Sequence, residues 1–139
     1  MPLTLTRRVR FSAAHRYLRP DWSAERNAEV FGACARPSFH GHSYFCDVTV
    51  AGTLDEETGM ICDLGALDRA LDREVRDRFD MRNINLDVPE FADGRRIPTG
   101  EELARFIAER VQQALGGAAT VVEVMVAEDE TLRATWTLN

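Results

Sequence analysis

Four segments of the chain have the residue pattern of β-strands. Residues 3–11 alternate apolar with polar side chains, the period of two that is typical of a half-buried strand. Residues 43–51 are rich in β-branched and aromatic side chains, which favour strands. Residues 121–127 and 132–138 have similar patterns on either side of an acidic turn. The sequence therefore predicts one pair of strands in each half of the chain.

Two amphipathic helices are predicted between these pairs. Apolar residues recur at steps of three and four in the first, namely Leu64, Leu67, Leu71, Val75 and Phe79. The second helix begins at Thr99, which Glu102 follows three residues later as in a capping box, and it ends at Gly116. Residues 16–38 and 83–96 are predicted as long loops, the first with room for one helical turn.

This order of elements predicts an α+β fold, ββααββ, in which two helices cover one face of an antiparallel sheet. The 139 residues fit a single domain over 1–139, and a chain of this length can bury a core without disulfides or metals. We expect function in the two long loops, because binding and catalytic residues concentrate in loops held by a rigid scaffold.

Composition excludes several classes of protein. All 17 basic residues are Arg, so catalysis through a Schiff-base or P-loop lysine is excluded. The net charge of −6 argues against sequence-independent binding of nucleic acid, which needs a basic surface. No apolar run reaches 18 residues or resembles a signal peptide, so no membrane span is expected. Three cysteines without a CxxC pair fit the reducing cytoplasm, the expected location.

The three histidines could form a metal site. His40 and His42 are two residues apart on a predicted strand, so both imidazoles point to the same face. His15 ends the first strand, and pairing of the strands could bring it to the same point. Three His ligands with an open fourth position are typical of a catalytic zinc site. The alternative is that the HxH pair arose by chance and that His15 lies at the surface.

Other polar residues are candidates with equally simple structural explanations. Cys34 could act as a base or nucleophile if a nearby cation favours its thiolate, or could be an inert buried thiol. Glu128 follows an apolar strand and could bind an amidine-like group through two hydrogen bonds, or could be a solvated turn residue. Asp80 could be a surface residue at a helix end. Thr99 caps a helix, and Glu101 is a favourable charge in its first turn.

Seven motifs occur together in a recognisable order. They are Phe11-Ser-Ala-Ala-His15, Phe31-Gly-Ala-Cys34, His40-Gly-His-Ser-Tyr44, Thr58-Gly-Met60 with Asp63-Leu64, Leu86-Asp-Val-Pro89, Pro98-Thr-Gly-Glu101 and Glu128. Each is weak alone, but in this order they resemble the 6-pyruvoyl-tetrahydropterin synthase / 6-carboxy-tetrahydropterin synthase family. The resemblance extends from about residue 5 to Trp136.

The resemblance implies a tunnelling fold (T-fold) whose sheets assemble into a barrel, in trimers that stack into hexamers with active sites between subunits. It implies Zn²⁺ bound by His15, His40 and His42, and 7,8-dihydroneopterin triphosphate or a close pterin as substrate. The pterin ring would be anchored by Glu128, in a pocket lined by Thr99 and Glu101. Cys34 would be the general base, while zinc would bind the side-chain oxygens of the substrate and acidify its carbons.

The sequence departs from the family at one catalytic position. The family has an Asp-His pair where this chain has Asp80 and Met81, and a thioether cannot shuttle a proton as imidazole does. Loss of a positioned acid or base slows a reaction by about 10²–10⁴-fold. Asp80 could compensate in part through a water molecule.

Three hypotheses for the function follow: a pyruvoyl-type synthase, a lyase that cleaves the side chain (such as the 6-carboxy type), or a pterin-binding protein with impaired catalysis. The 18 residues between His15 and Cys34 favour the pyruvoyl type, which has the longer first loop.

Overall fold

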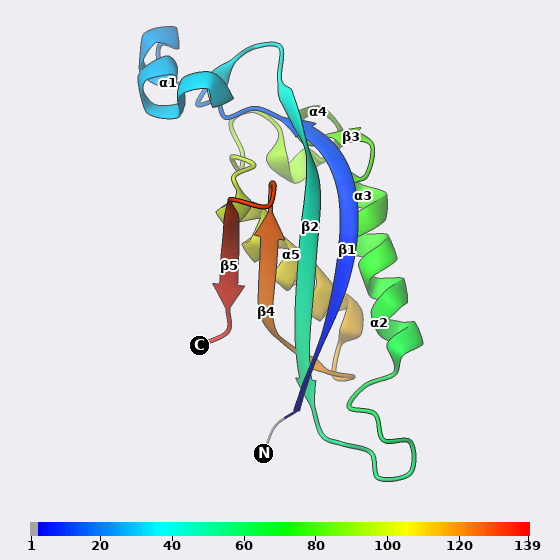
Figure 1. The fold of residues 1–139 in the computed structure, drawn as a ribbon. Helices are drawn as coiled ribbons and strands as arrows, with labels where there is room; N and C mark the ends of the chain where they lie inside the picture. Colours follow the sequence, from blue (N-terminus) through cyan, green and yellow to red (C-terminus); the bar gives the residue numbers. More distant parts are fainter. Residues whose placement is uncertain (1–2) are drawn as a thin grey trace.

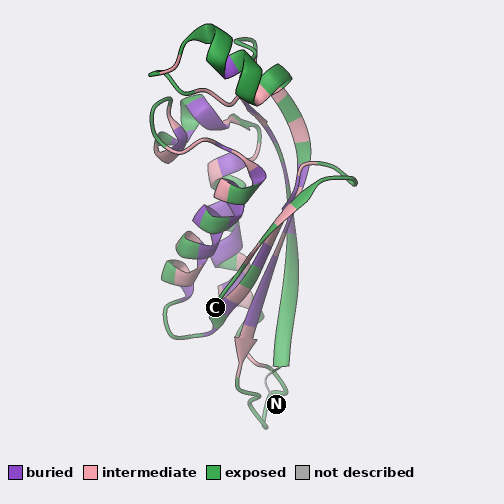
Figure 2. Ribbon diagram, turned by 90° about the vertical axis from the view of Figure 1, so that its left-hand side faces the viewer, coloured by how far each residue is buried: buried purple, intermediate pink, exposed green. Residues whose placement is uncertain are grey.

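The computed structural model describes residues 3–139, which form one five-stranded sheet with helices packed on one of its faces (Figures 1 and 2). The strands lie in the order β3-β1-β2-β4-β5. They are β1 (Leu3–His15), β2 (His40–Gly52), β3 (Arg82–Asn83), β4 (Thr120–Ala127) and β5 (Arg133–Thr137). The four longer strands pair antiparallel, which confirms the α+β prediction. The short β3 adds a parallel pairing with β1 that the sequence pattern did not predict.

Both predicted helices are present. The first consists of α2 (Leu64–Leu71), a π-helical segment η2 (Asp72–Arg76) and α3 (Asp77–Phe79). The second is α5 (Gly100–Leu115). Its N-cap is Thr99, whose hydroxyl accepts a hydrogen bond of 3.1 Å from the Glu102 N–H. The Glu102 carboxylate pairs with Arg105, so only one of the two hydrogen bonds of the expected capping box forms.

The two predicted loops contain more regular structure than expected. Residues 16–38 include a two-turn helix, α1 (Ala24–Phe31), and a 3₁₀ helix, η1 (Gly32–Ala35). The second loop includes β3, α4 (Ile84–Asp87) and the 3₁₀ helix η3 (Pro89–Phe91). Hydrophobic periodicity missed α1 because it buries only Asn27 and therefore has no apolar stripe. Ser23 accepts a hydrogen bond from the Arg26 N–H, so the start of α1 depends on local capping.

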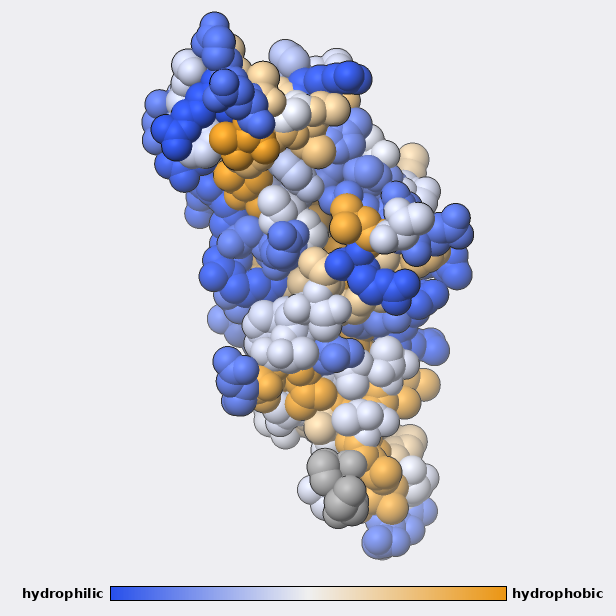
Figure 3. Space-filling view, turned by 60° about the vertical axis from the view of Figure 1, so that its left-hand side comes forward, coloured by the Kyte–Doolittle hydropathy of each residue, from blue (hydrophilic) through white to orange (hydrophobic). Residues whose placement is uncertain are grey.

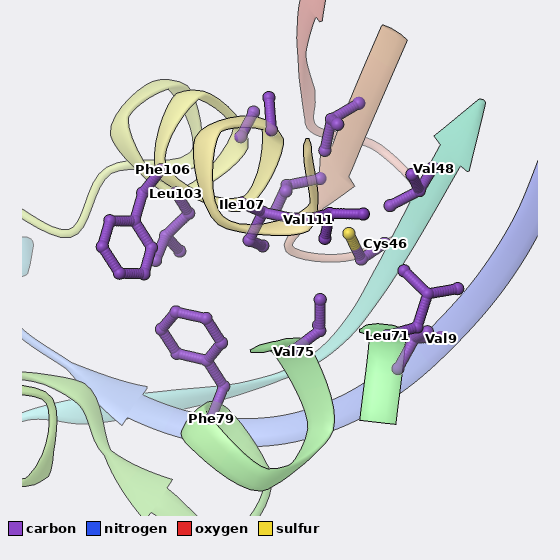
Figure 4. Close-up of a cluster of buried hydrophobic side chains, with 14 of the residues drawn as sticks. Val9, Cys46, Val48, Leu71, Val75, Phe79, Leu103, Phe106, Ile107 and Val111 are labelled. Atoms are coloured by element: carbon purple, nitrogen blue, oxygen red, sulfur yellow. The ribbon is translucent and has the colours of Figure 1, made fainter. Parts of the chain in front are cut away.

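The hydrophobic core lies between the sheet and the helices (Figure 4). In the close-up, Phe106 and Ile107 of α5 face Val75 and Phe79, while Cys46 projects from β2. Phe11 of β1 stacks on Tyr44 of β2, with ring centroids 4.7 Å apart, and it also stacks on Phe79 at 5.4 Å. These contacts between neighbouring strands and the helix fix the register in which β1 and β2 pair.

The opposite face of the sheet is polar and has no helix on it (Figure 2). Arg8 of β1 forms an ion pair of 2.7 Å with Asp47 of β2, and both Arg8 and Arg10 lie over the Phe45 ring. The side of the molecule that carries β5 is mostly hydrophilic, and its hydrophobic residues form small separate patches (Figure 3). Across residues 3–139, no helix combines the length and the apolar character needed to cross a membrane.

A buried carboxylate joins the two long helices. Glu74 of η2 accepts hydrogen bonds from Arg110 of α5 at 3.0 Å and from Arg78 at 3.1 Å. Burial raises the pKa of Glu74, but the hydrogen bonds and charges of Arg110 and Arg78 outweigh it, so the pKa lies below its ordinary value. The ionised Glu74 carboxylate therefore stabilises the folded protein at neutral pH. This contribution is lost as the pH falls through the pKa of Glu74 in the folded state.

We predict that Glu74→Gln lowers the free energy of unfolding by about 2 kcal/mol at neutral pH. This is less than the roughly 3–5 kcal/mol for fully buried pairs, because the arginine partners reach water. Urea denaturation followed by circular dichroism measures the change. The matched control is Asp72→Asn in the same segment, which removes an exposed pair with Arg76 and should cost less than about 0.5 kcal/mol. Equal effects of the two substitutions would contradict the prediction.

Candidate functional site

The candidate residues gather at one end of the sheet, where β1 ends and β2 begins (Figure 1). The antiparallel register pairs His15 with His40, and His42 lies two residues further along the same face of β2. The ring of His15 lies 4.7 Å from that of His40 and 5.1 Å from that of His42, measured between centroids. One nitrogen of each imidazole lies within 4.8 Å of the other two. The structure therefore brings the three predicted ligands together.

His15 is held in one orientation by the backbone before α5. Its Nδ1 lies 2.8 Å from the carbonyl oxygen of Pro98, which can only accept, so Nδ1 carries the proton and Nε2 is left as the ligand atom. The Tyr44 hydroxyl lies 3.2 Å from the same Nδ1. Burial lowers the pKa of His15 to about 4, so the ring is neutral at physiological pH, as a metal ligand must be.

The other two histidines also fit a metal ion. His42 Nε2 is buried and has no hydrogen-bond partner among the described residues, a costly arrangement that a bound cation would relieve. Burial and the neighbouring His42 lower the pKa of His40, which favours its neutral form. Three imidazoles form a donor set suited to a transition metal with an open coordination position. The cluster therefore fits a metal ion in its chemistry as well as its geometry.

Glu128 lies beside this cluster rather than in solvent. It follows β4 directly, and its side chain is only 12% exposed. The Tyr17 hydroxyl donates a hydrogen bond of 3.1 Å to Glu128 Oε1, while Oε2 lies 3.6 Å from His42 Nε2. The alternative of a solvated turn carboxylate therefore does not hold, and a largely enclosed carboxylate is available to a ligand.

A cavity of about 290 Å³ lies next to the histidine cluster, with Glu128 between the two. Its walls include Tyr17, Glu101 and Glu128, and β5 forms the opposite side. Gly100 also lines it, and a Cβ at that position would lie 3.3 Å from the Ala134 side chain, so glycine lets α5 begin close against β5. The volume is near the lower end of the roughly 300–1,000 Å³ of small-molecule sites, which suits a flat heterocycle.

Cys34 lies on η1, next to Tyr17. Its carbonyl oxygen accepts a hydrogen bond of 2.7 Å from the Tyr17 N–H. Burial and the Glu128 carboxylate raise the pKa of the Cys34 thiol. The neighbours on this chain therefore favour the protonated thiol, whereas the sequence hypothesis required a thiolate.

Asp80 lies away from this cavity, at the outer edge of β1. Its carboxylate accepts a hydrogen bond of 3.0 Å from the Ser12 N–H, and the next N–H, of Met81, donates to the Ser12 carbonyl at 2.7 Å. Met81 has a left-handed backbone conformation, with φ of 59°, and an 83% exposed side chain. It lines a separate depression with Ser12 and Arg82. Within one chain, Asp80 and Met81 are thus not part of the Glu128 cavity.

Thr99 lies beside the cavity rather than in its wall, and three further groups of the site were not expected from the sequence. Thr99 caps α5, and the cavity is lined instead by the residues that follow it, Gly100 and Glu101. Tyr17, the Pro98 carbonyl and the Tyr44 hydroxyl were not predicted from the sequence. Tyr17 had one available signal, since it lies two residues after His15, whereas a backbone carbonyl leaves no mark in a sequence.

Comparison with known proteins assigns the chain to a family. A family model described as 6-pyruvoyl tetrahydropterin synthase matches residues 4–138. The chain belongs to this family. The human 6-pyruvoyl tetrahydrobiopterin synthase is 38% identical over 111 residues, which are 80% of this chain and 75% of that protein. The family assignment confirms the resemblance seen in the motifs and makes the chain an enzyme of the lyase class.

Two further relatives locate the chain within the 6-pyruvoyl tetrahydropterin synthase family. The structure of the Caenorhabditis elegans 6-pyruvoyl tetrahydropterin synthase has a TM-score of 0.92 and 29% identity, and the match covers 100% of this chain and 97% of that one. A 6-carboxy-5,6,7,8-tetrahydropterin synthase from Bacillus subtilis is 32% identical over 74% of this chain and 69% of that protein. The similarity is therefore higher to the pyruvoyl-type relative from human.

We predict that the purified chain binds about one metal ion per subunit and that His42→Ala abolishes this binding. The substitution removes one of three ligands, and two imidazoles hold a metal ion much more weakly. Elemental analysis after gel filtration measures the metal content. Glu101→Gln, in the wall of the adjoining cavity, is the control and should keep the metal. A His42→Ala protein with wild-type metal content would contradict the assignment of the cluster.

Proposed function

We propose that this chain is a zinc-dependent 6-pyruvoyl-type synthase that acts on 7,8-dihydroneopterin triphosphate. The observation that carries the proposal is the cluster of His15, His40 and His42 beside a cavity with a largely enclosed carboxylate, Glu128. The three imidazoles and an open fourth position suit Zn²⁺. When bound, zinc acts as a Lewis acid on the oxygens of the substrate side chain and acidifies the carbons between them.

Glu128 is the proposed anchor of the pterin ring. The 2-amino group and N3–H of a pterin form a pair of parallel donors, which match the two oxygens of a carboxylate. Such paired, charge-assisted hydrogen bonds are strong in a site that excludes water. Glu101 lines the same cavity, and Thr99 fixes the start of α5 from which Glu101 projects. These residues orient the ring so that its side chain extends toward the histidines.

Cys34 and Asp80 are the proposed proton carriers. The reaction eliminates triphosphate and moves protons between side-chain carbons, so a base must take up a proton and return it. Cys34 Sγ is proposed to accept that proton. Its own neighbours raise the pKa of the thiol, so we propose that the reactive thiolate forms only in the loaded and assembled site. Asp80 acts from the outer edge of β1, and we propose that it contributes to the site of an adjacent subunit.

The open edges of the sheet support assembly into trimers or hexamers. On its outer side, β1 pairs with β3 only at Ala13 and Ala14, and β5 is the strand at the other edge. Exposed strand edges in a small sheet are normally covered by pairing with another chain. Joining the edge of β5 to that of β1 in a second copy would extend the sheet into the barrel of the T-fold, with residues 1–139 as one domain in each subunit.

A second candidate is a lyase of the 6-carboxy type, or a pterin-binding protein with impaired catalysis. Met81 is the observation that favours it, because its exposed thioether replaces the family's catalytic imidazole and cannot carry a proton near neutral pH. Zinc and one base suffice to cleave the side chain by a retro-aldol step. The similarity to the Bacillus subtilis protein, which is named as a 6-carboxy synthase, also supports the 6-carboxy type.

We predict that the zinc-loaded protein converts 7,8-dihydroneopterin triphosphate under anaerobic conditions and that Cys34→Ala lowers kcat by about 10²–10⁴-fold, the usual contribution of a positioned base. Phosphate release and chromatography of the pterin products measure the reaction. Cys62→Ala is the matched control, because Cys62 packs beside the hydrophobic core and should leave kcat unchanged. Met81→His should raise kcat.

The pterin product distinguishes the candidates. The 6-pyruvoyl product supports the proposal, whereas 6-carboxy or 6-hydroxymethyl pterins support a side-chain-cleaving lyase. A protein that holds zinc but forms no pterin product, before or after Met81→His, would rule out the pyruvoyl activity. Pterin binding that depends on Glu128 in such an inactive protein would support the binding function.

A further inference from the structure

Tyr17 connects four parts of the site. Its N–H donates to the Cys34 carbonyl at 2.7 Å, which ties η1 to the end of β1. Its ring packs edge-on against Phe31 of α1, at 5.8 Å between centroids, and against His15 at 5.2 Å. Its hydroxyl reaches across the cavity to Glu128, at 3.1 Å. A side chain fixed at its backbone and on two sides of its ring can hold its hydroxyl at a defined point.

The Tyr17 hydroxyl is the donor that orients the Glu128 carboxylate. The other polar group beside that carboxylate is His42 Nε2, at 3.6 Å from Oε2, which is beyond hydrogen-bond distance. Among residues 3–139, Tyr17 is therefore the one side chain that donates a hydrogen bond to the Glu128 carboxylate. Without it, the long Glu128 side chain would be free to rotate out of the plane of a bound ring.

We propose that Tyr17 is a positioning residue that sets the selectivity of the cavity for 2-amino pteridines. By holding Oε1 of Glu128, Tyr17 fixes the plane in which the carboxylate meets the paired donors of the ring. Each carboxylate oxygen has two acceptor positions, so Oε1 can accept from Tyr17 and from the ligand at once. A ring with a carbonyl at position 2 presents an acceptor to the carboxylate and is disfavoured only while the carboxylate stays in place.

This inference rests on the proposed function, because it assumes that Glu128 binds a pterin ring. It concerns a different property, which is the ratio of affinities for two rings rather than turnover. A purely structural role for Tyr17 would change folding or metal content and would leave that ratio unaffected. The ratio is therefore the informative measurement.

The test compares two ligands that differ at one position. Fluorescence titration of the zinc-loaded protein gives the Kd of 7,8-dihydroneopterin and of its 2-oxo analogue, with the same side chain. Wild type should prefer the 2-amino ring. Tyr17→Phe keeps the ring packing and removes the hydroxyl, and it should reduce this preference by about tenfold, as expected for one hydrogen bond to a charged group. With dihydroneopterin triphosphate, KM should rise by a similar factor while kcat stays within about twofold.

A second variant separates positioning from packing. Glu128→Gln removes the charged partner, so adding Tyr17→Phe to it should change the preference no further, as in a double-mutant cycle. Unchanged zinc content and thermal midpoint in Tyr17→Phe would support the assignment. If Tyr17→Phe instead lowers affinity for both rings equally, with or without Glu128, its role is structural and the proposal is overturned.

The remaining outcomes distinguish the two proposals. If wild type fails to bind 7,8-dihydroneopterin, or binds both rings equally, the proposed function of Glu128 fails and the inference fails with it. If wild type prefers the 2-amino ring and Tyr17→Phe keeps the full preference, only the role of Tyr17 is overturned.

Discussion

The pairing of β1 with β2 is the constraint on which the rest of the structure depends. The register extends without interruption from Leu3 opposite Gly52 to His15 opposite His40. A slip by one residue would send His40 and His42 to the opposite face of the sheet from His15, because side chains alternate along a strand. The stack of Phe11 on Tyr44, held against Phe79, resists such a slip from inside the core. Packing in the core beside the site thus determines where the imidazoles meet, because the Tyr44 ring that stacks on Phe11 also carries the hydroxyl next to His15.

Much of this architecture could be predicted from the sequence, for physical reasons that act locally. The long strands and helices bury one face each, so their apolar residues repeat with the period of the element. The two histidines of the HxH pair share a face in any strand, and Thr99 caps α5 as its spacing to Glu102 indicates. The convergence of His15 required only that the two predicted strands pair, which the structure shows.

Other features could not be predicted, because they arise from contacts between distant residues. Glu128 meets Tyr17 across more than a hundred residues of sequence, and neither position has a local pattern that indicates the partner. The orientation of His15 depends on a backbone carbonyl, that of Pro98, which any residue could supply. The helix α1 has no apolar stripe, so its one local signal in the sequence is the N-cap residue Ser23. Asp80 lies outside the Glu128 cavity because its hydrogen bond with the Ser12 N–H holds it at the outer edge of β1, and no local pattern indicates that placement.

The backbone at Met81 has a consequence for the evolution of the site. The left-handed conformation of this residue is maintained by a main-chain hydrogen bond to Ser12, and its side chain makes little contact with the fold. Folding therefore constrains this position mainly through its backbone, which disfavours proline and β-branched residues, and places little further demand on the exposed side chain. Residues with different chemistry can replace one another here without repacking the core. A substitution at position 81 can therefore change the chemistry offered at this edge of the sheet while the fold stays the same.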